Sequence, residues 1–291
     1  MKGVGCVIWF GPSGNSESFY RAGNRHSWQM PRWLKKMGLN AYEYQCNKGT
    51  NIKKETAEKI GEEAKKAGIR MSIHAPYYIN LASTDEIKRE NSVQYILKTL
   101  QIADWMGAGR IVVHTGAVGK MSREKAMTLA LPALAQALKE ADISGFSEIS
   151  ICPEVLGRIS QLGDLDEIIF MCGLDERMIP CVDFGHVYAR SLGRALKTID
   201  DYRRIFNALE NSLGKERTDK LHIHFSRIEF TDAGERRHHT VEDTEYGPDF
   251  EPLAKVLTER KAEPVIICES RDRMAEDALI LKHIYEAQKI Q

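Results

Sequence analysis

The sequence predicts an α/β fold, a (β/α)8 TIM barrel, on three observations. Apolar runs rich in β-branched and aromatic residues recur eight times, and segments with a helical pattern lie between them. The runs begin 28 to 43 residues apart, which suits a repeating unit of strand, loop, helix and loop. Eight such units within 291 residues call for a closed barrel of parallel strands. The predicted strands are 4–10, 41–45, 69–74, 110–114, 148–152, 178–184, 221–225 and 264–268.

The helical pattern is clearest in two of the intervening segments, 51–68 and 87–107. In the first segment, apolar residues gather on one face and lysine and glutamate on the other. In the second, Val93, Ile96 and Leu100 share one stripe. Each segment therefore presents one apolar face that can pack on a sheet.

An open, doubly wound sheet is the alternative fold. Such sheets usually carry a G-x-G-x-x-G turn after the first strand, and here only the loop GPSG (11–14) follows it. No low-complexity linker divides the chain, so we expect one domain over 1–291. The polar segment 226–247 is expected to be a long loop, and loops of that length are often functional.

Composition excludes some classes of protein. The formal net charge is zero, so no global basic character points to nucleic acid, although a local basic face remains possible. No apolar run is long enough to cross a membrane. The six cysteines form no C-x-x-C pair, which favours buried free thiols in a reducing compartment and a cytoplasmic location.

Residues that can bind metals stand at or just after the ends of six successive predicted strands. Parallel strands of a barrel bring these ends to one face, where the active sites of such barrels lie. Histidine and carboxylate without thiolate are the ligands expected for Zn²⁺, with Mn²⁺ or Fe²⁺ as alternatives. The candidates are His74, His114, Glu154, Asp183 with His186, His222 or His224, and Glu269.

The seventh strand offers two histidines, because residues two apart on a strand share a face. Either His222 or His224 could be the metal ligand, and the other would lie one layer deeper or support the ligand. The segment GERRHH (234–239) adds Glu235 and His238, with His239 as a further possibility. The strand ends and this segment together offer more ligands than one ion can bind, so we expect two or three ions per chain. Neighbouring divalent ions suit hydrolysis of a phosphate ester.

These motifs resemble those of the endonuclease IV family, a branch of the xylose-isomerase-like barrels. HAPYYINLAS (74–83) is similar to that family's strand-three motif, and CVDFGH (181–186) to its strand-six motif. VVHTG (112–116) and the glutamate of CES (268–270) match the family's strands four and eight. The resemblance implies a metal-dependent endonuclease that hydrolyses the phosphodiester 5′ of an abasic site in duplex DNA. It also favours a monomer.

The resemblance implies a role for each candidate residue. His74 and His114 would hold a first zinc ion, which Glu154 would bridge to a second ion held by Asp183, His222 and Glu269. His186 would hold a third ion with Glu235 and His238. Glu154 and Glu269 are expected to be the catalytic carboxylates. The residues expected to contact DNA are Tyr77, Tyr78, Arg227, Arg236 and Arg237.

The segment that follows strand seven departs from the family pattern. The family has Asp-Arg-His, whereas this chain has Glu235-Arg236-Arg237-His238, with one extra residue between the acid and the histidine. Two other functions therefore stay open. One is a sugar isomerase or epimerase with one metal ion, in which Glu154 and Glu269 would transfer a proton. The other is a DNA-binding protein without catalytic activity.

Overall fold

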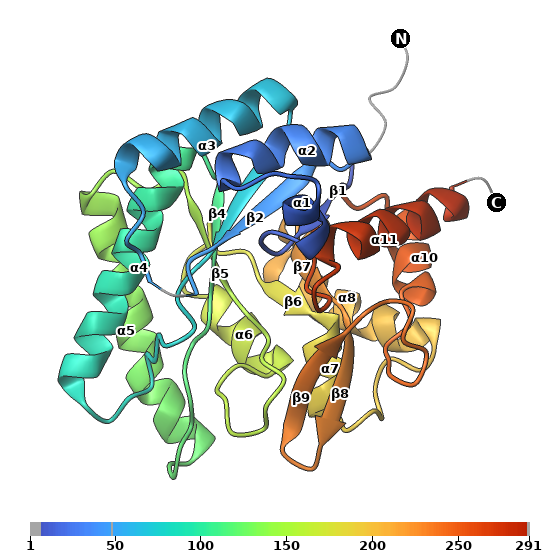
Figure 1. The fold of residues 1–291 in the computed structure, drawn as a ribbon. Helices are drawn as coiled ribbons and strands as arrows, with labels where there is room; N and C mark the ends of the chain where they lie inside the picture. Colours follow the sequence, from blue (N-terminus) through green and yellow to red (C-terminus); the bar gives the residue numbers. More distant parts are fainter. Residues whose placement is uncertain (1–6, 48, 290–291) are drawn as a thin grey trace.

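The computed structural model describes residues 7–47 and 49–289 and shows a barrel of eight parallel strands surrounded by helices (Figure 1). All eight predicted strands are present, so the predicted fold class is confirmed. The barrel strands are β1 (Trp9–Pro12), β2 (Ala41–Gln45), β3 (Arg70–His74), β4 (Arg110–Val113), β5 (Ser150–Pro153), β6 (Cys181–Asp183), β7 (His222–Phe225) and β10 (Val265–Cys268). The start of the first predicted strand, residues 4–6, lies outside the described residues.

The barrel consists of two four-stranded sheets that meet at two seams. One sheet has the order β2-β3-β4-β5 and the other β1-β10-β7-β6. A parallel bridge between Ser13 and Glu43 joins β1 to β2, and one between Glu154 and Cys181 joins β5 to β6. The strand order around the ring therefore follows the chain, as expected of alternating β and α units.

The helices cover the outside of the ring and bury their apolar faces against it. The two helical segments predicted from the pattern are present as α3 and α4. The α-helices are α1 (Glu17–Arg21), α2 (Met30–Met37), α3 (Lys54–Ala67), α4 (Glu86–Met106), α5 (Arg123–Ile143), α6 (Leu165–Cys172), α7 (Phe184–Arg190), α8 (Ile199–Leu213), α9 (Lys215–Asp219), α10 (Glu251–Arg260) and α11 (Met274–Gln288). A short 3-10 helix, η1, spans Ser27–Gln29.

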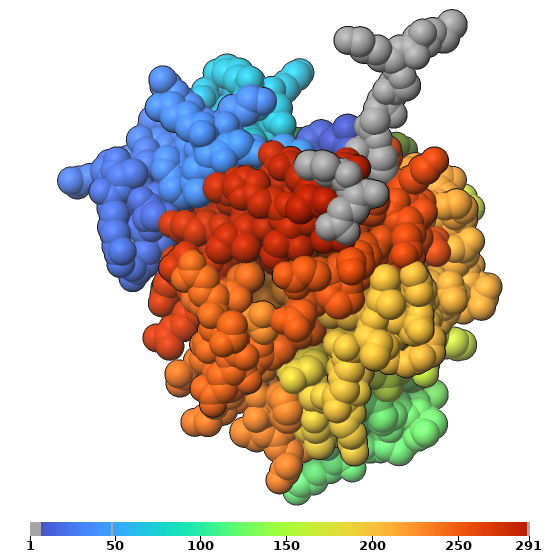
Figure 2. Space-filling view, turned by 90° about the vertical axis from the view of Figure 1, so that its right-hand side faces the viewer, coloured from blue at the N-terminus to red at the C-terminus, as the bar shows by residue number. Residues whose placement is uncertain are grey.

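The two ends of the chain close the barrel together. Strand β1 pairs with β10, and the C-terminal helix α11 lies against the N-terminal part of the chain, as the red and blue surfaces show in Figure 2. No helix within the described part of the chain is long and apolar enough to span a membrane. Five cysteines, Cys46, Cys152, Cys172, Cys181 and Cys268, are buried free thiols, as predicted, whereas Cys6 lies outside the described residues.

The segment 226–247 is not the long loop that its polarity predicts. It contains an antiparallel hairpin of β8 (Arg227–Thr231) and β9 (Gly234–His239), which projects beyond the ring of barrel strands (Figure 1). Its strands carry charged residues because one face is open to solvent, so the apolar alternation that identifies a buried strand is absent. This hairpin brings residues distant from the barrel core to the strand ends.

Candidate metal centre at the barrel mouth

The ends of the barrel strands bring the candidate ligands together in three adjoining groups. We call these the first, second and third mouth groups, and their ligand atoms lie within 4.8 Å of one another in each group. The first contains His74, His114 and Glu154; the second contains Glu154, Asp183, His224 and Glu269; the third contains His186, His238 and Glu269. Glu154 and Glu269 are each shared by two groups.

The first mouth group surrounds one oxygen of Glu154. Oε2 of Glu154 lies 2.9 Å from Nε2 of His114 and 3.3 Å from Nε2 of His74. Nδ1 of His74 donates to the carbonyl oxygen of Ala75 at 2.7 Å, which leaves Nε2 directed at the mouth. Burial opposes protonation of the His74 ring, but Glu154 outweighs burial and raises the pKa of His74 to about 9.

The second mouth group surrounds the other oxygen of Glu154. Nδ1 of His224 lies 3.1 Å from Oε1 of Glu154 and 3.5 Å from Oε1 of Glu269. Asp183 stands beside His224 in the register of β6 and β7. Its Oδ1 accepts the backbone N–H of His186 at 2.7 Å, whereas its buried Oδ2 has no hydrogen-bond partner. Burial raises the pKa of Asp183, and the neighbouring carboxylates Glu269 and Glu154 add to that rise.

The third mouth group joins helix α7 to the hairpin. Nε2 of His186 is buried without a hydrogen-bond partner and lies 3.5 Å from Oε2 of Glu235. His238 extends toward the same carboxylate, with its Nε2 3.7 Å from Oε1 of Glu235. Nδ1 of His186 donates to the carbonyl oxygen of Val155 at 2.9 Å, so the ring presents Nε2 to the hairpin.

A β-bulge explains the extra residue between Glu235 and His238. In a regular strand, residues three apart lie on opposite faces. Here Phe230 pairs with Glu235 and Glu229 pairs with Arg237, so Arg236 has no partner residue across the hairpin. The bulge puts both ligand-type side chains on the mouth face and turns Arg236 outward to Glu229. Despite the extra residue, Glu235 and His238 therefore both lie beside His186, although Glu235 is outside the third mouth group as defined above.

Two glycines allow the hairpin to reach the mouth. The backbone N–H of Glu235 donates to the carbonyl oxygen of Gly157 at 3.1 Å. A Cβ on Gly157 would lie 2.7 Å from Cβ of Glu235 and 2.9 Å from Cδ2 of His186, and a Cβ on Gly234 would lie 2.3 Å from the carbonyl oxygen of Gly157. A side chain at Gly157 would displace Glu235 or His186, and a side chain at Gly234 would displace the backbone of residues 157–159.

The three groups fit divalent cations. Among the described residues, none of Glu154, Asp183, Glu235 and Glu269 forms an ion pair with lysine or arginine; their charged-group partners are histidines. Two of these carboxylates, Glu154 and Asp183, are fully buried, and a buried carboxylate requires a partner that compensates its charge, which a cation can supply. The unpartnered Oδ2 of Asp183 and Nε2 of His186 are atoms that a metal ion would use. The donors, imidazole and carboxylate, suit Zn²⁺, Mn²⁺ or Fe²⁺.

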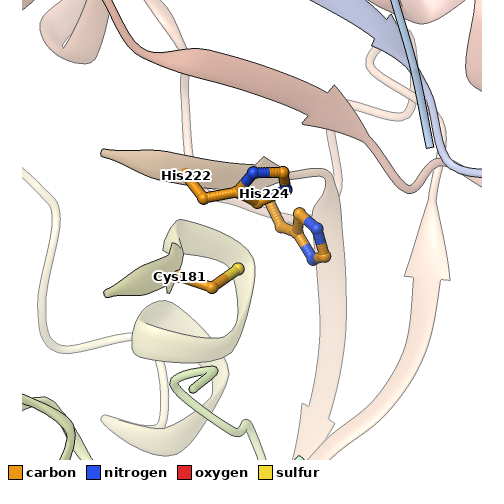
Figure 3. A group of neighbouring side chains, drawn as sticks. All are labelled: Cys181, His222 and His224. Atoms are coloured by element: carbon orange, nitrogen blue, oxygen red, sulfur yellow. The ribbon is translucent and has the colours of Figure 1, made fainter. Parts of the chain in front are cut away.

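The structure places three predicted residues away from the mouth. His222 lies one layer deeper than His224, and its Nε2 donates to Oε2 of Glu43 at 2.9 Å, so His224 takes the position expected for His222 (Figure 3). His239 lies on the other side of the hairpin between Asp243 and Glu229. Arg227 donates to the carbonyl oxygens of Val241 and Tyr246 and pairs with Asp249, so its guanidinium is already bound within the protein.

The remaining predicted DNA contacts are exposed. Tyr77 and Tyr78 have exposed fractions of 64% and 43% and pack edge to face with a ring separation of 5.7 Å. Tyr77 lines an open pocket of about 700 Å³ that also contains His74, His114, His186 and Glu269. Arg236 and Arg237 are exposed on β9. The tyrosines therefore stand beside the three groups.

Glu43 is a buried charged residue that the sequence analysis missed. It lies on β2 and contacts Ser72, His222 and His224. A signal was present, since AYEYQ places an acidic residue at the centre of a predicted barrel strand. It was not used because Glu43 does not stand at a strand end.

Comparison with known proteins identifies the family. Residues 31–286 match the family described as a xylose isomerase-like TIM barrel. The chain belongs to this family. It is 33% identical over 252 residues to an uncharacterised protein of Methanocaldococcus jannaschii, a match that covers 87% of this chain and 89% of that protein. The family match and this relative thus both cover most of the chain.

Curated relatives include proteins named as probable endonuclease 4. The chain is 25% identical over 160 residues to that of Mycoplasma genitalium, which covers 53% of this chain and 52% of that protein. It is 25% identical over 193 residues to that of Aquifex aeolicus, covering 65% of this chain and 66% of that protein. These matches span about half to two thirds of the relatives' length. They confirm the resemblance to endonuclease IV that the strand motifs indicated.

Solved structures support the fold. Endonuclease IV from Thermus thermophilus superposes with a TM-score of 0.66 at 19% identity, over 98% of this chain and 99% of that chain. A D-tagatose 3-epimerase-like protein superposes with a TM-score of 0.68 at 17% identity, over 97% and 99%. Nucleases and sugar epimerases thus share this barrel, so function has to be argued from the site.

Proposed function

We propose that the protein is a metal-dependent endonuclease that hydrolyses the phosphodiester 5′ of an abasic site in duplex DNA. The observation that carries the proposal is the arrangement of the three mouth groups around one open pocket, linked by shared carboxylates. One oxygen of Glu154 faces His74 and His114, and the other faces His224. A carboxylate that turns one oxygen to each of two groups is suited to bridging two ions.

Divalent ions bound in these groups would polarise a phosphoryl oxygen and lower the pKa of a water molecule. The protein side chains define where the substrate can bind. Four carboxylates repel a phosphate, so the pocket accepts one only when cations compensate for them. This charge arrangement suits a substrate whose reacting group is an anion.

The rim of the pocket suits a damaged duplex. Two exposed aromatic rings, Tyr77 and Tyr78, stand beside the mouth, and Tyr78 packs edge to face on Tyr95 with a ring separation of 4.9 Å. An aromatic side chain held in this way can stack against bases when a nucleotide leaves the helix. Extrusion of a nucleotide requires least energy where the base is missing. Curated relatives named as endonuclease 4 agree with this substrate.

Incision of defined duplexes tests the proposal. The purified protein, loaded with Zn²⁺ or Mn²⁺, is expected to cut a duplex with one abasic site and to leave an undamaged duplex intact. E154Q is expected to lower the rate by more than about a hundredfold, because loss of residues that only support metal ligands already reduces activity by 10–100-fold. H239Q is the matched control, since His239 lies outside the mouth. Equal rates for E154Q and the wild-type protein would contradict the proposal.

A sugar epimerase is the second candidate, and the second mouth group favours it. One histidine, one aspartate and two glutamates surround a single point there, a set that can hold one ion without the other groups. A metal content of one per chain, with interconversion of free ketoses and no DNA incision, would select this candidate. Two or three metal ions per chain would favour the endonuclease.

A further inference from the structure

Glu43 has no part in the proposed reaction, yet it lies directly beneath the mouth. Its side chain is fully buried, and Oε2 accepts hydrogen bonds from Oγ of Ser72 at 2.8 Å and Nε2 of His222 at 2.9 Å. Its other oxygen, Oε1, lies 3.1 Å from Nε2 of His224, a charge contact without hydrogen-bond geometry, so Nε2 has no hydrogen-bond partner. We call Glu43, Ser72 and His222 the floor group.

Both oxygens of the Glu43 carboxylate face partner atoms. Oε2 accepts hydrogen bonds from Ser72 and His222, and Oε1 accepts one from Nε2 of Gln45 at 3.3 Å and faces Nε2 of His224. No lysine or arginine pairs with Glu43 within the part of the chain that the structure describes. The carboxylate therefore acts on the two histidines, and one of these reaches the mouth.

His224 connects the floor to the mouth through its two ring nitrogens. Nε2 faces Glu43, and Nδ1 faces Glu154 and Glu269. With a proton on Nε2, the ring presents the lone pair of Nδ1 to the second mouth group. A carboxylate beside the far nitrogen of a ligating histidine sets the orientation and protonation of that histidine in metal sites.

We infer that Glu43 is the positioning residue of the metal centre: it holds the Nε2 side of His224, so that Nδ1 is presented to the second mouth group. This inference rests on the proposed metal centre and extends it to a carboxylate that touches neither the ion nor the substrate. It also explains why His224 rather than His222 is the ligand. Nε2 of His222 donates to the same carboxylate, and His222 lies deeper in the barrel than the mouth groups.

Cys181, His222 and His224 could instead hold an ion of their own. Figure 3 shows the three side chains, with Cys181 on the neighbouring strand β6, and their ligand atoms lie within 4.8 Å of one another. Cys181 and His222 begin strands β6 and β7, two residues before the mouth residues Asp183 and His224. They therefore lie deeper in the barrel than the mouth groups, and neither of them lines the open pocket. The positioning role is the better supported of the two.

Binding of Co²⁺ to the metal-free protein tests the inference without DNA. The absorption of Co²⁺ reports the ligands around it, and the titration gives the number of sites and their affinities. E43Q keeps an oxygen that can accept a hydrogen bond but removes the charge, and E43A removes both. We expect the affinity of one site to fall by about 10–100-fold in E43A, with an altered absorption spectrum and a smaller loss in E43Q.

Two control variants separate positioning from general loss of structure. S72A removes a hydrogen bond to Glu43 without touching His224 and is expected to bind Co²⁺ as the wild-type protein does. C181A leaves the contact between Glu43 and His224 in place and is expected to keep the full Co²⁺ content. A purely structural role for Glu43 predicts that E43Q and E43A are less stable but bind Co²⁺ with unchanged affinity and spectrum. That result would overturn the inference.

The remaining outcomes are also decisive. A loss of one Co²⁺ in C181A would assign an ion to Cys181, His222 and His224 and overturn the positioning role. A wild-type protein that takes up no Co²⁺ would overturn both the metal centre and this inference. Uptake of Co²⁺ without DNA incision, together with the loss in the Glu43 variants, would support the positioning role and overturn only the proposed activity.

Discussion

The mouth and the floor of the barrel contain the same residue types but differ in how their charges are satisfied. At the floor, one carboxylate, Glu43, faces two histidines and a serine, and both of its oxygens have partners. The floor atoms without a hydrogen-bond partner are ring nitrogens, Nδ1 of His222 and Nε2 of His224. At the mouth, four carboxylates lie among five histidines, and a carboxylate oxygen, Oδ2 of Asp183, also lacks a hydrogen-bond partner. The comparison teaches that ligand-type residues alone do not define a metal site. Several carboxylates that converge on one place, one of them with an oxygen that lacks a hydrogen-bond partner, do define one.

The largest expected effect is a loss of stability when the Glu43 carboxylate is removed from the floor group. E43A leaves two buried histidines without their carboxylate. Removing one partner of a buried ionic pair costs about 3–5 kcal/mol, so the free energy of unfolding of the metal-free protein should fall by that amount. Denaturant unfolding monitored by circular dichroism measures the change. An unchanged midpoint would mean that the floor is not a stabilising ionic group.

The next largest effect is expected from removing the charge of Asp183 at the mouth. Unlike the loss of Glu43, this change should not lower the stability of the protein. In D183N, the amide oxygen can still accept the backbone N–H of His186 at the start of α7, while the charge beside Glu154 and Glu269 is removed. We expect unchanged or higher stability of the metal-free protein and a loss of metal affinity of more than about a hundredfold. Isothermal titration with Zn²⁺ and denaturant unfolding together test this prediction. If D183N proved less stable than the wild-type protein, the carboxylates of the mouth and the floor would not differ in their effect on stability.

The comparison could be anticipated only in part from the sequence. The eight strands and their spacing were predictable because parallel barrel strands are buried on both faces and therefore read as apolar runs. The ligand ring was predictable because the candidates stand at strand ends. Alternation along β7 places both His222 and His224 inward, and only the register against β6, where Asp183 pairs with His224, separates them.

Other features depend on contacts distant in the sequence. The role of Glu43 follows from a partner 179 residues away, His222, which no local pattern reveals. The hairpin of β8 and β9 was read as a loop because its outward face is charged. Its bulge depends on the pairing of Glu229 with Arg237, which spacing within GERRHH does not show.

A smaller effect is expected at the point where the hairpin meets the barrel. G157A introduces a methyl group against Glu235 and His186 and should displace the third mouth group. Inserting a methyl group into a packed site costs about 1–3 kcal/mol. Elemental analysis should show one metal ion fewer per chain, with the first and second groups still occupied. Full metal content in G157A would show that the third group tolerates displacement of the hairpin.

The smallest effect is expected from deletion of Arg236. Without the bulge residue, Glu235 and His238 become separated by one residue and again lie on the same face of a regular strand. Metal content should therefore remain that of the wild-type protein, measured in the same way and with H239Q as a companion control. Loss of one ion would show that the bulge positions these two side chains in a way that a regular strand does not.

The approach of Gly157 to Gly234 has a consequence for how new sites of this kind are recognised. A search of sequences for histidines and acids would report Glu235, His238 and His186 and pass over the two positions at which nothing can be added. Those positions decide whether the three side chains can meet at all. A relative with alanine at position 157 could keep every ligand residue and look complete in an alignment. Its Glu235, His238 and His186 would still be unable to meet at the mouth.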